Sequence, residues 1–172
     1  MPNPQPYLDL RCRKRRLAGI SLLVAAGGTA LDQLSKALMV HQLHLGQVQP
    51  VLPGLLQWRL VENTGAAFSL FHGGVVWLGL ISFLVSLGLV LWLLRRPPRR
   101  LSSAVAYGLL LAGAMGNGLD RWRLGAVVDW IEWVPLVPLV NEWFPVFNLA
   151  DVAINMAVAL LLLDTLLQSR RS

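Results

Sequence analysis

Residues 75–100 read VVWLGLISFLVSLGLVLWLLRRPPRR, in which twenty uncharged and mostly apolar residues precede four arginines arranged around a proline pair. A run of about 20 apolar residues is long enough for a helix to cross the hydrocarbon core of a bilayer. Pro97 and Pro98 end such a helix and predict a tight turn. The arginines predict a cytoplasmic turn, because membrane proteins concentrate Lys and Arg in their cytoplasmic loops.

Three further apolar stretches lie on either side of this segment, and each is long enough to form a membrane helix. The four predicted helices cover residues about 17–40, 75–94, 101–119 and 146–167. Four crossings place the N-terminus, the 95–100 turn and the C-terminus on one side, and all three are basic. We therefore expect an all-α membrane protein with both termini cytoplasmic and two extracytoplasmic segments, about 41–74 and 120–145.

The composition indicates one lipid-embedded domain over residues 1–172. The chain is 55% hydrophobic and 14% charged, with a mean hydropathy of +0.57, whereas soluble domains carry about 25% charged residues. The net charge of +6 does not indicate nucleic-acid binding, because the basic residues gather in short runs beside the apolar stretches. The single cysteine, Cys12, excludes an internal disulfide. Alternatively, the first apolar stretch is a signal peptide that is cleaved near Ala30. Asp32 and Lys36 would then lie at the new N-terminus, where their pairing has no evident role.

The predicted outer segments carry signals other than helices. Residues 55–61 alternate partly between apolar and polar side chains and predict a short strand, so we expect a small β-containing part between the first and second helices. Pro135 and Pro138 argue against a fifth helix. Five tryptophans predict an aromatic belt at the membrane surface. They are Trp58, Trp122, Trp130, Trp133 and Trp143.

Polar residues inside the predicted helices need a reason, because a charge at the bilayer centre costs about 2.5–3.5 kcal/mol. Asp32 and Lys36 are four residues apart on one helix face and are expected to pair, mainly as a salt bridge that makes both charges tolerable in the membrane; the alternative is a strut that holds a nearby site. A second stripe lies at the outer end of the third helix, where glycines allow close helix contact and polar groups supply hydrogen bonds. Its members are Gly113, Gly116, Asn117 and Asp120, and Arg121 follows as a possible clamp for a carboxylate or phosphate.

Asp129 and Asp151 are the candidates for acid–base chemistry. Asp129 follows an apolar run, so burial is expected to raise its pKa. Asp151 lies in the first turn of the last helix, where the macrodipole favours an ionised carboxylate, and it shares a face with Asn148 and Asn155. Two carboxylates whose pKa values are pushed apart suit attack by a water molecule. In the alternative interpretation, Asp129 ends a solvent-exposed loop and Asp151 only caps a helix.

Other site chemistries are not indicated. The three histidines lack the spacing of a zinc protease, and we expect neither a metal nor a cofactor. Ser35 and Lys36 are adjacent on a helix, so their side chains diverge and do not form a Ser–Lys dyad. A proton-conducting transporter is the main rival to an enzyme, but the second helix offers no charge to extend a relay. A scaffold subunit leaves the clustering of the polar stripes unexplained.

Five motifs, in this order, resemble those of bacterial lipoprotein signal peptidases (signal peptidase II). They are DQLSK at 32–36, NTGAAF at 63–68, GNGLDR at 116–121, VVD at 127–129 and FNLAD at 147–151. The resemblance extends from the first predicted helix to the last. Two features depart from the family pattern: Gly113-Ala114 and Gly118-Leu119 in the third helix, and a somewhat long interval between Asp129 and Asp151.

The resemblance implies an aspartyl endopeptidase that cleaves prolipoproteins just before a cysteine carrying a diacylglyceryl group. Asp129 and Asp151 match its catalytic pair and are expected to share one proton across a water molecule. The residues expected to line or support the site are Asn63, Gly65, Asn117, Asp120, Arg121, Asn148, Asp32 and Lys36, with Asn155 added from its helix face.

The resemblance also implies a place in the cell. We expect a monomer in the bacterial cell (inner) membrane, in contact with membrane lipids and with its active site at the extracytoplasmic face. No nucleic-acid partner is expected.

Overall fold

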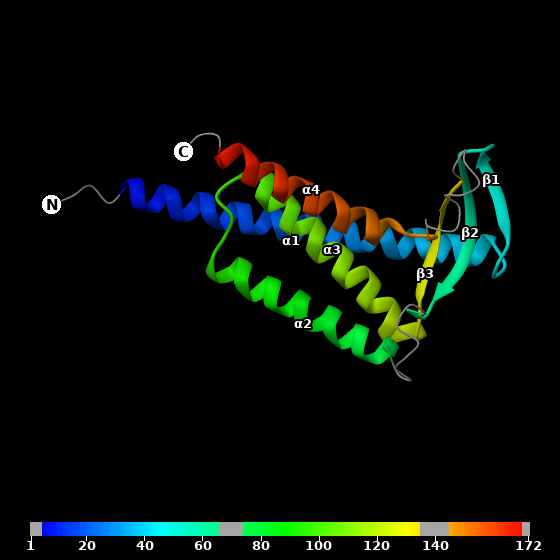
Figure 1. Ribbon diagram of the computed structural model, residues 1–172. Coiled ribbons are helices and arrows are strands. Elements are labelled where there is room, and N and C mark those ends of the chain that lie inside the picture. Colours follow the sequence, from blue (N-terminus) through cyan, green and yellow to red (C-terminus); the bar gives the residue numbers. More distant parts are fainter. Residues whose placement is uncertain (1–4, 66–73, 135–144, 170–172) are drawn as a thin grey trace.

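The computed structural model describes residues 5–65, 74–134 and 145–169 and contains four long helices and a small sheet. The helices are α1 (Gln5–Gln42), α2 (Gly74–Arg95), α3 (Leu101–Leu124) and α4 (Leu149–Ser169). In Figure 1 the start of α1, the α2–α3 turn and the end of α4 lie at one end of the bundle, and the sheet lies at the other. All four predicted helices are therefore present.

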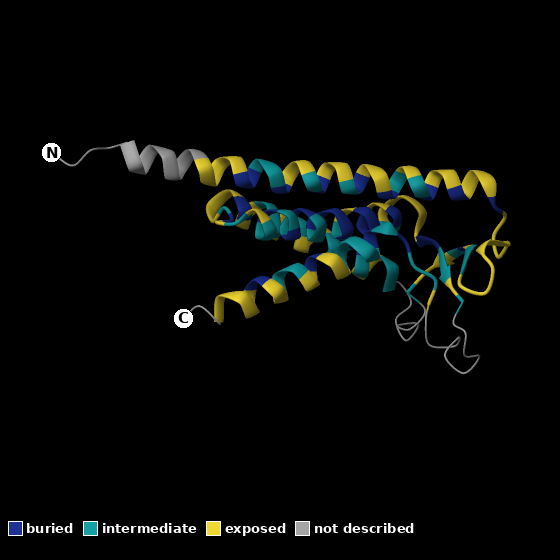
Figure 2. Ribbon diagram, turned by 90° about the horizontal axis from the view of Figure 1, so that it is seen from above, coloured by how far each residue is buried: buried dark blue, intermediate teal, exposed yellow. Residues whose placement is uncertain are grey.

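Helix α3 lies at the centre and contacts each of the other three helices. Its glycines allow this contact: a Cβ added at Gly108 would lie 2.7 Å from the carbonyl oxygen of Ser21, and one at Gly113 would lie 2.5 Å from that of Ala150. Figure 2 shows the resulting contrast between the buried residues of α3 and the exposed outer face of α1. Small side chains on α3 thus bring the polar residues of α1 and α4 close to those of α3.

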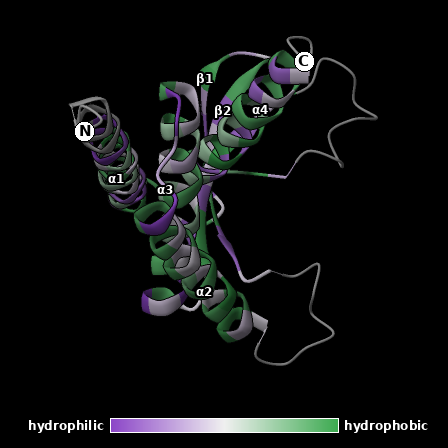
Figure 3. Ribbon diagram, turned by 90° about the vertical axis from the view of Figure 1, so that its left-hand side faces the viewer, coloured by the Kyte–Doolittle hydropathy of each residue, from purple (hydrophilic) through white to green (hydrophobic). Residues whose placement is uncertain are grey.

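Within the described residues, three helices are long and apolar enough to cross a membrane: Arg13–Gln42, Gly74–Arg95 and Leu149–Ser169. Figure 3 shows how strongly hydrophobic residues dominate α2. Helix α3 is not in this group, although its 24 residues are sufficient in length. The physical reason is its own composition, because its serines, glycines and Asn117 lower its hydropathy. These small and polar residues suit a helix that lies at the centre of the bundle.

Three predicted helix boundaries were wrong. Helix α1 begins at Gln5 instead of near residue 17, and α3 continues to Leu124, where Gly125 ends it with a φ of 72°. Asp120, which the predicted polar stripe already assigned to this helix, and Arg121 therefore both lie within α3. Helix α4 begins at Leu149, so Asn148 precedes it.

The segment that a signal peptidase would remove under the cleavage alternative is part of the packed bundle. The Ser21 hydroxyl donates a hydrogen bond to the Ala104 carbonyl of α3 over 2.8 Å. Helix α1 also continues unbroken through Ala30. This packing favours an uncleaved first helix.

The sheet contains β1 (Val48–Leu52), β2 (Leu56–Asn63) and β3 (Val127–Trp133), which pair antiparallel in the order β1-β2-β3. The strand predicted over residues 55–61 is confirmed as β2. The expectation of an otherwise all-α chain, with β structure only between the first two helices, was incomplete. The second outer segment contributes β3, which pairs with β2 across a long sequence separation, and such non-local pairing leaves no short-range sequence signal.

The aromatic-belt prediction was wrong for Trp130. Its indole is 9% exposed and packs edge-on against Trp58, with ring centroids 6.2 Å apart, in the apolar core beneath the sheet. Trp122 and Trp133 are 60% and 46% exposed, as expected of a belt. Trp143, together with the predictions for Pro135, Pro138 and residues 66–73, lies outside the described residues.

Candidate active site

Asp129 and Asp151 line one cleft, at the end of the bundle that carries the sheet. The cleft has a volume of about 550 Å³ and lies between β3 and the first turns of α4. Asn63 and Asn155 also line it, and Phe147, Val152 and Met156 supply apolar surface. The structure therefore brings both candidate carboxylates to a common space that can admit a substrate segment.

Asp129 lies in β3 with only 2% of its surface exposed. The Asn63 side-chain amide donates to its Oδ2 over 3.0 Å, and that of Asn148 donates to its Oδ1 over 2.6 Å. Burial raises its pKa from 3.8 to about 6; the negative charge of Asp151 acts in the same direction, and the two amides oppose it. The predicted rise is confirmed, and the alternative of a solvent-exposed Asp129 is wrong.

Asp151 caps α4 together with Asn148. The Asp151 backbone N–H donates to the Asn148 side-chain oxygen over 3.0 Å, and the Asn148 backbone N–H donates to Asp151 Oδ2 over 3.1 Å. This reciprocal pair is a capping box. Asp151 Oδ1 accepts a further bond of 2.8 Å from the Asn117 side chain. Asp151 thus does cap the helix, as the alternative interpretation held, but it also faces the cleft.

Asn148 connects the two aspartates and is completely buried. Its side-chain nitrogen donates to Asp129, and its side-chain oxygen and backbone nitrogen bind Asp151. The same side-chain nitrogen lies 3.0 Å from the Asn117 oxygen. One buried amide therefore sets the position of both carboxylates.

Beneath the cleft lies a buried ion cluster centred on Lys36. Its ammonium lies 2.9 Å from Asp32 and 2.7 Å from Asp120, and it donates to the Asn117 side-chain oxygen over 3.1 Å. All three charged side chains are at most 4% exposed. The predicted Asp32–Lys36 pair is confirmed. Lys36, not Arg121, is the ion-pair partner of Asp120 among the described residues, because α1 and α3 pack closely enough to join them.

The two carboxylates of this cluster also hold the backbone beside the candidate catalytic residues. Asp120 Oδ2 accepts from the N–H of Val128, over 3.2 Å, and Asp32 Oδ1 accepts from the N–H of Ala150, over 2.9 Å. Val128 directly precedes Asp129, and Ala150 directly precedes Asp151. The ion cluster therefore connects to both aspartates through the main chain.

Of the remaining predicted site residues, Asn155 lines the cleft, whereas Gly65 and Arg121 are not among its lining residues. The Gly65 N–H donates to the Asn63 side-chain oxygen over 2.9 Å, and Gly65 has a φ of 75°, which favours glycine. The Asn155 side chain donates to the Asp151 backbone carbonyl and not to its carboxylate. Arg121 is half-buried and donates to the Asn117 carbonyl over 3.2 Å.

Gln33 is a supporting residue that the sequence prediction missed. Its amide donates to Asp120 over 2.8 Å and to the Gly116 carbonyl over 3.2 Å. An amide within an apolar helix, next to Asp32, was the available signal. In the part of the chain that the structure describes, no three His, Cys, Asp or Glu side chains form a group that could hold a metal ion.

Comparisons with known proteins agree on one family. Residues 24–167 match the family described as signal peptidase (SPase) II. A lipoprotein signal peptidase of Synechococcus sp. (strain RCC307) is 55% identical over 149 residues, which cover 86% of this chain and 94% of that protein. One of Parasynechococcus marenigrum (strain WH8102) is 48% identical over 154 residues, covering 88% and 89%. A solved structure described as a bacterial membrane enzyme, at 1.9 Å resolution, superposes with a TM-score of 0.77 at 30% identity, covering 86% and 93%.

Proposed function

The chain belongs to the signal peptidase II family of aspartic peptidases, and from this premise we propose that Asp129 and Asp151 form its catalytic pair. The protein is a multi-pass membrane peptidase that processes prolipoproteins. The observation that carries the assignment is the common cleft, where buried Asn148 connects the two carboxylates.

In the proposed reaction Asp151 is the base and Asp129 is the acid. Asp129 carries the raised pKa, so it retains a proton to higher pH than an ordinary carboxyl group. A water molecule in the cleft gives one proton to Asp151 while its oxygen attacks the scissile carbonyl carbon. Asp129 donates its proton to the carbonyl oxygen as negative charge develops there.

The tetrahedral intermediate then collapses as its C–N bond breaks. The proton held by Asp151 passes to the leaving amine, and one hydroxyl proton of the gem-diol intermediate returns to Asp129 as the new carboxyl group forms. The pair thereby regains its single shared proton after each turnover. Asn148 and Asn117 position the two carboxylates throughout, and each oxygen that they bind keeps a second lone pair for the reaction.

The proposed substrate is a prolipoprotein cut just before its diacylglyceryl-modified cysteine. A lipid-anchored cysteine stays at the bilayer surface. A cleft at the end of the helical bundle can bind it there while its acyl chains remain in the bilayer. We propose four crossings, counting α3, with the termini cytoplasmic and the sheet end at the extracytoplasmic face of the bacterial inner membrane. We also propose that the protein acts as a monomer.

The pair is tested with purified Asp129→Asn and Asp151→Asn proteins and a lipidated precursor peptide. Each substitution keeps the shape of the side chain but removes the titratable proton, so the rate should fall by about 10³-fold or more. Glu132→Gln is the matched control, since Glu132 lies on the same strand but pairs with Arg59 and Gln57. Cleavage by either Asn variant at the control rate would refute the pair.

A cellular experiment separates a peptidase from a transporter or scaffold. Mass spectrometry of lipoproteins in depleted cells should reveal precursors that carry the diacylglyceryl group and an intact signal peptide. Expression of the Asp129→Asn protein should not reverse the accumulation. Normal processing in depleted cells would end the proposal.

A further inference from the structure

A second cavity lies at the opposite end of the bundle from the candidate active site. It has a volume of about 630 Å³ and lies among α1, the α2–α3 turn, α3 and the end of α4. Five cationic side chains line it: Lys14, Arg95, Arg96, Arg99 and Arg100. A neighbouring cavity of about 320 Å³ shares Lys14, Pro98 and Arg99 and adds Arg13. The catalytic proposal uses none of these residues.

Among the side chains that the structure describes, in residues 13–65, 74–134 and 145–169, none of these five cations forms an ion pair with a carboxylate. The carboxylate of α4 at this end, Asp164, accepts hydrogen bonds of 2.7–2.8 Å from Ser102 and Ser103. The charge of Asp164 acts on Arg100, but five cations line the cavity, so it retains an excess of positive charge that would attract an anionic ligand.

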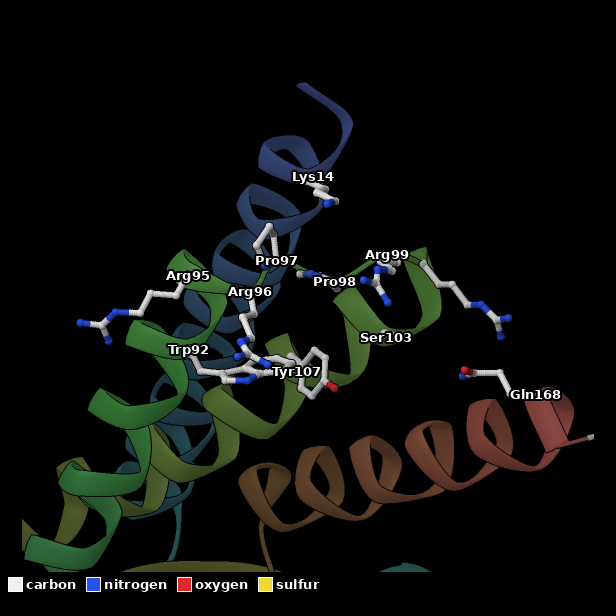
Figure 4. A pocket seen from close by; sticks show the side chains of 11 residues that line it. Lys14, Trp92, Arg95, Arg96, Pro97, Pro98, Arg99, Ser103, Tyr107 and Gln168 are labelled. Atoms are coloured by element: carbon white, nitrogen blue, oxygen red, sulfur yellow. The ribbon is translucent and has the colours of Figure 1, made fainter. Parts of the chain in front are cut away.

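The geometry of the cavity adds to its charge. Trp92 and Tyr107 pack edge-on with ring centroids 4.7 Å apart. Figure 4 shows Arg96 beside these rings, whereas Arg95 points away from them. A guanidinium beside aromatic faces loses little entropy on binding and presents a planar fork to an oxyanion. The N-terminus of α3, whose first turn contains no acidic residue, adds its positive dipole end.

The surroundings indicate a lipid rather than a free anion. Leu94 and Leu101, on either side of the turn, are 62% and 59% exposed. Helix α2, which ends at the cavity, is apolar along its length and long enough to span a bilayer. A ligand with its phosphate among the arginines can therefore lay its acyl chains along exposed apolar surface.

We propose that this cavity binds the phosphate of an anionic phospholipid headgroup, with Arg96 and Arg99 as its principal contacts. The competing explanation is that these residues only provide the general positive charge of a cytoplasmic turn. General charge acts equally from any basic residue at this end, whereas a binding site requires the geometry of particular guanidinium groups.

The test uses the purified full-length protein in detergent micelles and native mass spectrometry during titration with phosphatidylglycerol. The wild type should bind one molecule about tenfold more tightly than phosphatidylcholine, which corresponds to about 1.4 kcal/mol. Arg96→Gln/Arg99→Gln should lose about this tenfold preference. Arg15→Gln/Arg16→Gln removes the same charge from α1 residues that line neither cavity and should stay within about threefold of the wild type.

A charge-preserving variant guards against an effect on insertion or folding. Arg96→Lys/Arg99→Lys keeps every positive charge but loses the bidentate forks, so binding should weaken by about threefold or more. Wild-type binding by this variant, or equal losses in the two glutamine variants, would show that only general charge acts. Displacement of the lipid by inorganic phosphate at equal concentration would overturn the assignment to a lipid.

This inference does not depend on the proposed peptidase reaction. In micelles without anionic lipid, the Arg96→Lys/Arg99→Lys protein should cleave precursor at the wild-type rate, because the cavity and the aspartates lie at opposite ends of the bundle. Loss of lipid binding with retained cleavage would therefore concern this cavity alone.

Discussion

Replacement of Lys36 by methionine removes the cation on which the centre of the bundle depends. The ammonium lies within 3.1 Å of oxygens on Asp32, Asp120 and Asn117, and no more than 4% of the Lys36 side chain is exposed. Methionine has nearly the same length and fills the space, so the change isolates the loss of charge. Two carboxylates then remain buried without their counter-ion, although each keeps a backbone N–H donor.

Removal of one partner from a buried ion pair costs about 3–5 kcal/mol. In a protein of 150–250 residues each kcal/mol lowers the unfolding midpoint by about 2–4 °C, so Lys36→Met should unfold roughly 6–20 °C below the wild type. Arg59→Met is the control, since it breaks an ion pair with Glu132 whose arginine side chain is 46% exposed. An exposed pair contributes less than about 1 kcal/mol, so the control should lose no more than about 4 °C.

Tryptophan fluorescence during heating in detergent measures these midpoints. The double variant Lys36→Met/Asp120→Asn should regain part of the loss, because one of the stranded charges is then absent. Cleavage at a temperature below all the midpoints should still be reduced in Lys36→Met, because Asn117 loses the contact that orients it toward Asp151. An unfolding midpoint within about 2 °C of the wild type, or strictly additive effects in the double variant, would refute this account.

Three further predictions concern single positions. The folded state holds the pKa of Asp129 near 6 instead of 3.8, so proton binding at this residue favours folding. The unfolding midpoint temperature should therefore fall as the pH rises from about 4 to 6, and Asp129→Asn should reduce this pH dependence in thermal melts. Asn148→Ala should lower kcat by about 10²-fold, whereas Asn155→Ala, which loses only a backbone contact, should change it by less than about threefold in precursor assays. Gly116→Ala should lower the free energy of unfolding by about 1–3 kcal/mol, because its Cβ would lie 2.5 Å from a carboxylate oxygen of Asp32. A Cβ at Gly88 would meet nothing within 4 Å, so Gly88→Ala should be neutral or slightly stabilising in the same melts.

Features that depend on residues close together in the sequence were predictable. The i, i+4 spacing of Asp32 and Lys36 predicted their ion pair, because helix geometry alone brings them together. The apolar residues before Asp129 likewise predicted its raised pKa, since burial is the largest cause. Hydropathy predicted the helices for the same reason: twenty apolar residues in sequence already satisfy the requirement for a membrane helix.

Features that join distant segments were not predictable. Asp120 pairs with Lys36 because the glycines of α3 let α1 approach, whereas the linear order places only Arg121 and Arg123 near it. Tryptophan is a residue type that is typical of an aromatic belt. Trp130 is nevertheless buried beneath the sheet, because β3 pairs with β2. Residue type decides what a side chain can bind, but helix packing and strand register decide which groups it meets.

The sequence alone determined that the chain crosses a membrane, that its basic turns gather at one end, and that it carries five motifs of one peptidase family. It also made Asp129 and Asp151 the candidates for the acid–base groups of the proposed reaction. Only the tertiary structure decided how they are held: Asn148 connects both carboxylates, and Asp120 and Asp32 bind the backbone just before each of them. The reason is physical, because each of these bonds is directional and forms only when α1, α3, β3 and α4 are packed together.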